Sequence, residues 1–234
     1  MVTVIIPAYN EEETIEKVVR EAIGHPQVKE VIVVNDASTD ETAMRASFAG
    51  ARLISLSSNV GKAGAMEEGV KAASTDIVLF LDADVTGMTH EKISLIINPV
   101  VEGRLDMHVG IFDRPTLLTK KFFYILPVLS GLRALTKEIW YKVPAEQKKG
   151  FRIELALNHA ARKWGKGTGY EIVTGLEHKI KERKYGFWKG FRMRLKMIIE
   201  IFTISFILYV GSPIAEMRSV WWNWYTRASQ KRIP

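Results

Sequence analysis

The sequence contains no cysteine. Disulfide bonds and thiolate metal sites are therefore excluded, so the fold has to be stabilised by its core. The chain has 234 residues, of which 47% are hydrophobic. This length and composition predict one substantial domain with a core of its own, together with an appended segment.

Long apolar runs are also missing from the sequence. The clearest largely apolar stretch, Ile201–Val210, has ten residues, whereas a helix that crosses a bilayer needs about 20. The N-terminal residues 1–7 carry no basic side chain and soon turn polar, which predicts a first strand rather than a signal peptide. We therefore expect a cytoplasmic protein.

Negative charge is scarce in the C-terminal quarter of the chain. Residues 179–234 contain twelve Lys or Arg and three Glu, a net charge of +9, while the remaining residues sum to −2. A nearly neutral body with a strongly basic tail predicts that the tail meets an anionic partner.

One stretch combines a buried strand with an acidic end. Five consecutive apolar residues, Ile77–Leu81, are typical of a strand inside a parallel sheet, and Asp82-Ala83-Asp84 follows directly. Ligands of open α/β sheets bind at the carboxyl ends of the strands, and Mg²⁺ or Mn²⁺ takes oxygen ligands that it shares with substrate phosphates. The stretch predicts a metal–diphosphate site, and a polar turn after a strand is the alternative.

Strands and helices are predicted to alternate through the first half of the chain, and most of these strands end in polar residues. The expected strands are Val2–Ile6, Val31–Val34, Arg52–Leu56 and Ile77–Leu81, and the expected helices begin after Asn10, near Glu41 and after Asn59. Asn10, with Glu13 three residues later, is expected to cap the first helix. This order predicts an α/β nucleotide-binding half with a mostly parallel sheet.

The second half shows a looser pattern. The expected elements are a helix that Thr89 caps and that reaches about Val101, a strand over Asp106–Ile111, a helix that begins near Gly150 and a strand over Tyr170–Thr174. The sequence has no internal repeat and no low-complexity linker.

Four motifs at successive strand ends resemble those of family 2 glycosyltransferases of the GT-A fold. They are Pro7-Ala8-Tyr9-Asn10-Glu11-Glu12, Val34–Asp40, Asn59-x-Gly61-Lys62 and Asp82-Ala83-Asp84. Three looser motifs resemble the dolichyl-phosphate mannose synthase, or polyprenyl-phosphate glycosyltransferase, branch. They are Ser130-Gly131-x-Arg133, Gly150-Phe151-x-x-Glu154 and Arg183-x-Tyr185-Gly186.

The resemblance implies a fold and a domain organisation. The fold is Rossmann-like α/β, with a mostly parallel central sheet flanked by helices. The catalytic domain is expected over residues 1–186, with a nucleotide-sugar half over about 1–105 and an acceptor half over about 106–186. Residues 187–234 are then a separate helical tail.

In this family, the first four motifs hold a nucleotide-sugar and a metal ion. By resemblance, the nucleotide-binding residues are Pro7, Ala8, Tyr9, Glu11, Asp36, Asn59, Gly61, Lys62, Asp82 and Ala83. Asp36 is expected to accept hydrogen bonds from the base or ribose. Asp82 and Asp84 match the metal-binding DXD motif, which implies Mg²⁺ or Mn²⁺ on the diphosphate.

Two departures from the family pattern concern the metal and the catalytic base. The mannose synthase branch often has a polar residue two positions after the second Asp of the DXD motif, and here this residue is Thr86, a weaker ligand than a carboxylate. His178 is a candidate for the missing metal ligand, and a surface histidine is the alternative. No Glu-Asp pair marks a base, so Glu154 is the substitute; an acceptor that is itself a phosphate needs no strong base. The expected acceptor-binding residues are Ser130, Gly131, Arg133 and Arg183, and Arg133 is grouped with Glu154 as catalytic.

The tail combines the short apolar stretch with basic and aromatic flanks. Trp221, Trp222, Trp224 and Tyr225 stand among Arg and Lys residues, a composition typical of a membrane interface. It predicts amphipathic helices that lie on an anionic membrane surface. The alternatives are a transmembrane helix, a homodimer interface and nucleic-acid binding. Nucleic-acid binding leaves the apolar stretch unexplained, so no nucleic-acid partner is expected.

These observations predict an inverting glycosyltransferase. It would transfer a hexose from a UDP- or GDP-sugar to a lipid-linked acceptor, above all a polyprenyl phosphate, as a peripheral protein at the cytoplasmic side of the membrane in cell-envelope glycan biosynthesis. One alternative is a soluble phosphorylated acceptor such as a phosphoglycerate. Another is a non-catalytic nucleotide-sugar-binding scaffold, against which the intact Asp82 and Asp84 argue.

Overall fold

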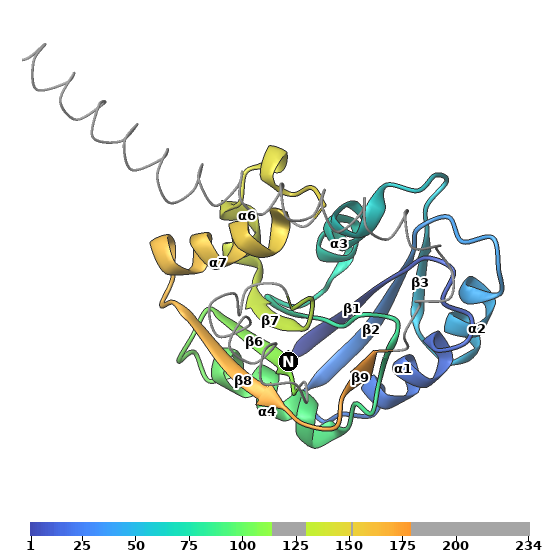
Figure 1. Ribbon diagram of the computed structural model, residues 1–234, viewed down its shortest axis with the longest axis horizontal. Helices are drawn as coiled ribbons and strands as arrows, with labels where there is room; N and C mark the ends of the chain where they lie inside the picture. Colours follow the sequence, from blue (N-terminus) through green and yellow to red (C-terminus); the bar gives the residue numbers. More distant parts are fainter. Residues whose placement is uncertain (114–129, 151, 179–234) are drawn as a thin grey trace, which may run out of the picture. The chain divides into compact units, whose positions relative to one another are not determined.

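A computed structural model describes residues 1–113, 130–150 and 152–178, and of His178 it describes the backbone alone. Within these ranges the chain alternates strands and helices (Figure 1). The elements are β1 (Val2–Ala8), α1 (Ile15–Ala22), β2 (Val28–Asn35), α2 (Thr42–Phe48), β3 (Arg52–Ser55), α3 (Gly61–Ala72), β4 (Ile77–Phe80), β5 (Val85–Thr86), α4 (His90–Val101), β6 (Met107–Phe112), β7 (Arg133–Thr136), α6 (Lys137–Lys142), a 3₁₀ turn (Ala145–Gln147), α7 (Arg152–Trp164), β8 (Thr168–Val173) and β9 (Glu177–His178).

Seven of these strands form one sheet in the order β3-β2-β1-β4-β7-β6-β8. The first four are parallel to one another, β6 and β8 are also parallel, and β7 runs antiparallel to both its neighbours. Ala8 pairs with Asn35, and Ile5 with Phe80. The carboxyl ends of β1, β2 and β4 therefore lie side by side. The predicted sheet, mostly parallel and flanked by helices, is confirmed.

The core has two layers, one on each face of the sheet. Successive side chains of a strand point to opposite faces, so Val4 and Ile6 pack in one layer and Ile5 in the other. The first layer includes residues of α1, α2 and α4, and the second includes residues of α3, α6 and α7. Figure 1 shows the two groups of helices on either side of the sheet.

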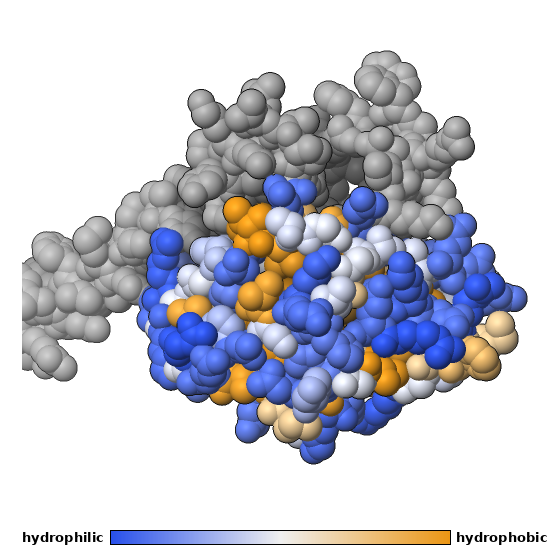
Figure 2. Space-filling view, turned by 90° about the horizontal axis from the view of Figure 1, so that it is seen from below, coloured by the Kyte–Doolittle hydropathy of each residue, from blue (hydrophilic) through white to orange (hydrophobic). Residues whose placement is uncertain are grey.

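In the face shown in Figure 2, hydrophilic residues predominate and smaller apolar areas lie between them. Some large apolar side chains are exposed, among them Phe48 with 75% and Met44, one turn earlier on α2, with 61%. Within the described ranges, none of the helices combines the length and the apolar character that a bilayer crossing requires.

The expected elements of the first half are found within a few residues of their predicted bounds. Thr89 caps α4 as predicted, since its side chain accepts a hydrogen bond from Lys92 N. The predicted cap at Asn10 is wrong. Helix α1 begins only at Ile15. The Asn10 side chain instead accepts a hydrogen bond from Thr39 N at 2.9 Å, and this bond links the loop after β1 to the loop after β2.

Five of the described elements were not predicted, namely β5, β7, α6, the 3₁₀ turn and β9. Strand β7 has four residues and begins with a buried arginine, so it lacks an apolar alternation, and α6 is a helix of only six residues. The two-residue strands β5 and β9 form a separate antiparallel ribbon. The predicted tail, residues 187–234, and Arg183 lie outside the described residues.

The packing of α3 on the sheet leads to a testable prediction at Gly69. A Cβ at this position would collide with the Ile5 side chain and lie 3.3 Å from Val34 Cγ2. Alanine is the better helix former by about 1 kcal/mol, but overpacking a core costs about 1–3 kcal/mol. We expect Gly69→Ala to lower the free energy of unfolding by about 1 kcal/mol, measured by urea denaturation.

The control for this variant is Lys71→Ala on the exposed side of the same helix, which should change the free energy of unfolding by less than about 0.5 kcal/mol. A Gly69→Ala variant as stable as the wild type would show that α3 can move away from β1 without cost.

Candidate active site

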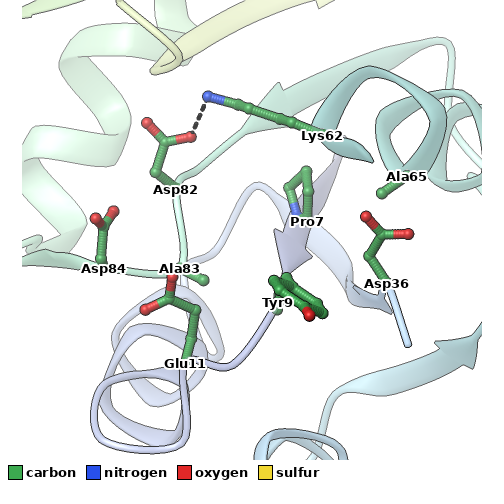
Figure 3. Close-up of a pocket in the computed structure, with 10 residues that line it drawn as sticks. Pro7, Tyr9, Glu11, Asp36, Lys62, Ala65, Asp82, Ala83 and Asp84 are labelled. Carbon is green, nitrogen blue, oxygen red and sulfur yellow. Dashed lines mark ion pairs between the residues drawn. The ribbon is translucent and has the colours of Figure 1, made fainter. Parts of the chain in front are cut away.

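A cavity of ≈ 350 Å³ lies at the carboxyl ends of β1, β2 and β4. Its lining residues are Pro7, Ala8, Tyr9, Glu11, Asp36, Lys62, Ala65, Asp82, Ala83 and Asp84 (Figure 3). All but Ala65 were predicted from the strand-end motifs. Ala65 follows Lys62 by three residues on α3, and this spacing places both on one face of the helix. The fold thus brings four separate motifs into one cavity.

The loops that follow β1 and β2 are bonded to each other beneath this cavity. Asn10 Oδ1 accepts from Thr39 N at 2.9 Å, and Glu11 N donates to Thr42 Oγ1 at 2.8 Å. Asn10 and Ala37 have φ angles of 54° and 59°, a left-handed conformation that costs a residue with a side chain about 1–3 kcal/mol and persists only where surrounding bonds enforce it. The cavity wall is therefore built before any ligand binds.

The carboxylate of Asp36 joins the end of β2 to the start of α3. It accepts hydrogen bonds from Val60 N at 2.7 Å and Gly61 N at 2.9 Å, where a helix N-terminus favours negative charge. Asn59 Nδ2 donates to the Asp36 backbone oxygen at 3.2 Å. Asn59 and Gly61 do not line the cavity; they position Asp36. The bond from Asp36 to a base or ribose stays a prediction.

The ammonium of Lys62 connects two carboxylates across the cavity. Lys62 Nζ lies 2.6 Å from Asp82 Oδ1 and 3.8 Å from Glu154 Oε1, and Figure 3 shows Lys62 reaching toward Asp82. Burial alone would lower the pKa of Lys62, but the charges of Asp82 and Glu154 outweigh it and raise this pKa. Lys62 is therefore positively charged across the physiological pH range, and its ammonium forms an ion pair with the first Asp of the DXD motif.

Glu154 and Asn158 are two buried polar residues on α7. They are separated by one helical turn and are 5% and 6% exposed. Glu154 Oε2 and Asn158 Nδ2 have no hydrogen-bond partner in the described part of the chain. Burial raises the pKa of Glu154, although Lys62 and Arg133 act in the opposite direction. Asn158 was not predicted; its i+4 spacing from Glu154 was the available signal.

The Ser130-Gly131-x-Arg133 motif packs behind the Lys62–Asp82 pair. Arg133 is fully buried, and its guanidinium donates to the backbone oxygens of Ser130 and Glu154. Ser130 Oγ donates to Gly110 O at 2.6 Å. A Cβ on Gly131 would lie 2.6 Å from Asp82 Oδ2 and would also collide with Lys62 Nζ, so a side chain there would have to displace the ion pair. Direct acceptor binding by Arg133 stays a prediction and requires its guanidinium to become exposed.

Asp82 and Asp84 are the metal-binding candidates within the described residues. No group of three or more His, Cys, Asp or Glu residues suited to a metal is found there. Two carboxylates in one cavity fit Mg²⁺ or Mn²⁺, because these cations take oxygen ligands and complete their shells with substrate phosphates and water. The backbone of His178 pairs with Val85, directly after Asp84. Its role as a ligand stays a prediction.

The raised pKa of Glu154 predicts a pH-dependent contribution to stability. The folded state holds this proton more tightly than the unfolded chain, in which the pKa is 4.5. The contribution is therefore present below that pH and is lost as the pH rises through the folded-state value. Relative to Glu154→Gln, the wild type should lose about 1.4 kcal/mol for each unit by which the pKa is raised.

Urea denaturation of both proteins between pH 4.5 and pH 8 measures this difference. The quantity to follow is the free energy of unfolding of the wild type minus that of Glu154→Gln. A difference that stays constant over this range would mean that the Glu154 carboxyl titrates as it does in the unfolded chain.

The chain is similar in sequence to a bacterial glycosyltransferase. The chain is 35% identical over 127 residues to 4,4'-diaponeurosporenoate glycosyltransferase of Staphylococcus aureus (strain USA300), a match that covers 52% of this chain and 33% of that protein. The chain thus matches only about a third of the length of this relative.

Solved structures share the fold. Glucosyl-3-phosphoglycerate synthase from Mycobacterium tuberculosis in complex with Mn²⁺, UDP-glucose and phosphoglyceric acid superposes with a TM-score of 0.72 at 22% identity, over 87% of this chain and 79% of that one. A complex of the same enzyme with Mg²⁺ and UDP has the same TM-score at 23% identity and covers the same shares of both chains. At this identity the likeness supports the GT-A fold alone.

The family follows from the sequence profile of glycosyl transferase family 2, which matches residues 3–165, well over half of the chain. The matched range includes β1 to α7, and with them all the residues that line the cavity. The chain belongs to glycosyl transferase family 2.

Proposed function

We propose that this protein transfers a hexose from a UDP- or GDP-sugar to a lipid-linked phosphate acceptor, above all a polyprenyl phosphate. The observation that carries the proposal is the cavity in which Asp36, Lys62, Asp82 and Asp84 converge from the ends of β2 and β4 and the start of α3. A nucleoside diphosphate with a divalent cation matches this set of groups, because it offers hydroxyls, phosphate oxygens and a metal that needs carboxylates.

Asp82 and Asp84 would hold Mg²⁺ or Mn²⁺ in this proposal. When bound, the cation would neutralise the diphosphate that leaves and orient it. Lys62 contributes positive charge next to Asp82, where the departing diphosphate gains negative charge. The bond between the anomeric carbon and the diphosphate oxygen breaks, and an acceptor oxygen forms the new bond to that carbon with inversion.

Glu154 is the proposed base when the acceptor carries a proton. Its carboxyl is buried next to Lys62 and its pKa is raised, mainly by burial. A carboxylate with a raised pKa accepts a proton more readily near neutral pH than an ordinary one. A phosphate acceptor is already anionic, so in that case Glu154 would position groups through Lys62 instead.

The lipid acceptor is supported by the sequence of residues 187–234, in which an apolar stretch has basic and aromatic flanks. We propose that this segment holds the protein at the cytoplasmic surface of an anionic membrane. A homodimer interface is the alternative use of the same residues.

A soluble phosphorylated acceptor is the second candidate. The observation in its favour is that the M. tuberculosis enzyme of the same fold was crystallised with phosphoglyceric acid and UDP-glucose. A screen of UDP- and GDP-sugars with Mn²⁺, using lipid extract and phosphoglycerate as parallel acceptors, separates the two candidates.

Metal-dependent donor binding can be tested at Asp84. We expect Asp84→Ala to weaken the binding of UDP or GDP in the presence of Mn²⁺ by more than about tenfold, because even residues behind a metal ligand have effects of this size. Isothermal titration calorimetry measures the affinity. The control is Asp76→Ala, since Asp76 directly precedes β4 at the opposite end of the same strand. Unchanged affinity of Asp84→Ala would contradict the metal assignment.

Membrane attachment can be tested with the full-length chain. We expect it to co-sediment with anionic vesicles but not with neutral ones. Added salt should weaken this binding, because charges are screened within about 8 Å at physiological ionic strength. Full release should need detergent, since apolar contacts resist salt. If the protein binds neither kind of vesicle and yet transfers sugar to phosphoglycerate, the result would favour the soluble acceptor.

A further inference from the structure

The turn that carries Asp84 continues into a two-stranded ribbon made of distant parts of the chain. In it, β5 pairs with β9, with Val85 opposite His178 and Thr86 opposite Glu177. Thr86 Oγ1 also donates to Glu177 O at 3.3 Å. Two residues per strand give few hydrogen bonds, and an isolated two-stranded ribbon is marginally stable at best. Something else must hold the ribbon in place.

Lys92, in the first turn of α4, spans the two strands of the ribbon at one end. Lys92 Nζ donates to Gly87 O at 2.6 Å and to Gly175 O at 3.0 Å. Gly87 follows β5, and Gly175 lies two residues before β9. Both glycines have positive φ angles, 79° and 68°, and a Cβ on Gly87 would collide with Gly175 O. The backbone is therefore shaped so that both carbonyls reach one ammonium.

The contacts of Lys92 differ from those of an ordinary surface lysine. Its charged donor serves two backbone carbonyls from separate segments, and hydrogen bonds that involve an ionised group are roughly twice as strong as neutral ones. Glu21 on α1 lies near the same loop. Burial raises the pKa of its carboxyl overall, although the backbone of Met88 and the charge of Lys92 both act to lower that pKa. Val85, Met88 and Leu176 anchor the ribbon in the core. Lys92 thus links the segment that contains Gly175 and Leu176 to the turn that follows Asp84.

We propose that Lys92 is a positioning residue for the metal–diphosphate end of the site. This inference rests on the proposed function. By fixing Gly87 and Gly175, Lys92 holds the Asp82–Asp84 turn against the segment that bears His178. It touches neither donor nor cation and acts through the backbone of the ribbon. Losing it would let the turn move, and metal binding depends on ligand positions within a few tenths of an ångström.

The test compares three variants of the full-length chain. Lys92→Met keeps the apolar stem but removes the donor, Lys92→Arg keeps charge and donors, and Lys71→Met removes an exposed ammonium of α3 that pairs with Glu68. Calorimetry measures the affinity for Mn²⁺ in the presence of UDP and of GDP, the affinity for each nucleotide with a chelator present, and thermal unfolding. If Lys92→Met does not fold, Lys92→Gln, which removes the charge but keeps an amide NH₂ group, takes its place.

We expect Lys92→Met to weaken Mn²⁺ binding about tenfold, as changes behind metal ligands do. Nucleotide affinity without metal should stay unchanged, Lys92→Arg should recover most of the loss, and Lys71→Met should match the wild type. Mn²⁺ affinity equal to the wild type in Lys92→Met would overturn the inference. The inference would also be overturned if Lys92→Met lost affinity for the nucleotide without metal in proportion to its fall in melting temperature. That result would indicate a merely structural role.

The same experiment separates this inference from the proposed function. A wild-type protein that binds no Mn²⁺ with either nucleotide would overturn the proposed function and the inference together. A wild type that binds Mn²⁺ with a nucleotide, beside a Lys92→Met variant that binds it equally well, would overturn the inference alone.

Discussion

The ion pair between Lys62 and Asp82 is the interaction on which the site depends. It joins α3 to the end of β4, and the approach of the same ammonium to Glu154 adds α7 to the cluster. Without this cation, two carboxylates would stand close together in a partly desolvated space, where like charges repel strongly. Gly131 makes the arrangement possible, because any side chain there would collide with the pair. One ammonium therefore organises contributions from four separate segments.

The nucleotide end of the cavity is secured in a different way. Side chains such as Asn10 and Asp36 bond to backbone N–H groups of neighbouring loops, so the loops are shaped by each other. Two residues of these loops, Asn10 and Ala37, have the left-handed conformation. Strain of this kind persists where the surroundings enforce it, and it gathers at functional sites. A wall that is already formed spares a ligand the entropy of ordering it.

A cluster of polar side chains from β7 and α7 is deeply buried next to Lys62. Arg133, Glu154 and Asn158 lie almost entirely out of solvent, and two of their polar atoms lack partners in the described residues. Unsatisfied buried polar atoms cost about 1–3 kcal/mol each, so a site that retains them gains when a ligand supplies the missing bonds. This side of the site therefore suits a polar group of the sugar or the acceptor.

The sequence by itself determined the strand-end motifs and the sheet. Buried strands that end in polar residues are a local signal, and parallel strands must bring their carboxyl ends to one edge. The resemblance of these motifs to those of family 2 glycosyltransferases then placed Pro7, Asp36, Lys62 and Asp82 in one site before the structure was known. The tertiary structure alone decided which partners the side chains chose. Asp36 binds the start of α3, Arg133 donates to backbone carbonyls and to Asn158 Oδ1, and Lys92 bridges two glycine carbonyls. These contacts link segments far apart in the chain, and a hydrogen bond between distant residues leaves no periodicity or spacing in the sequence from which it could be inferred.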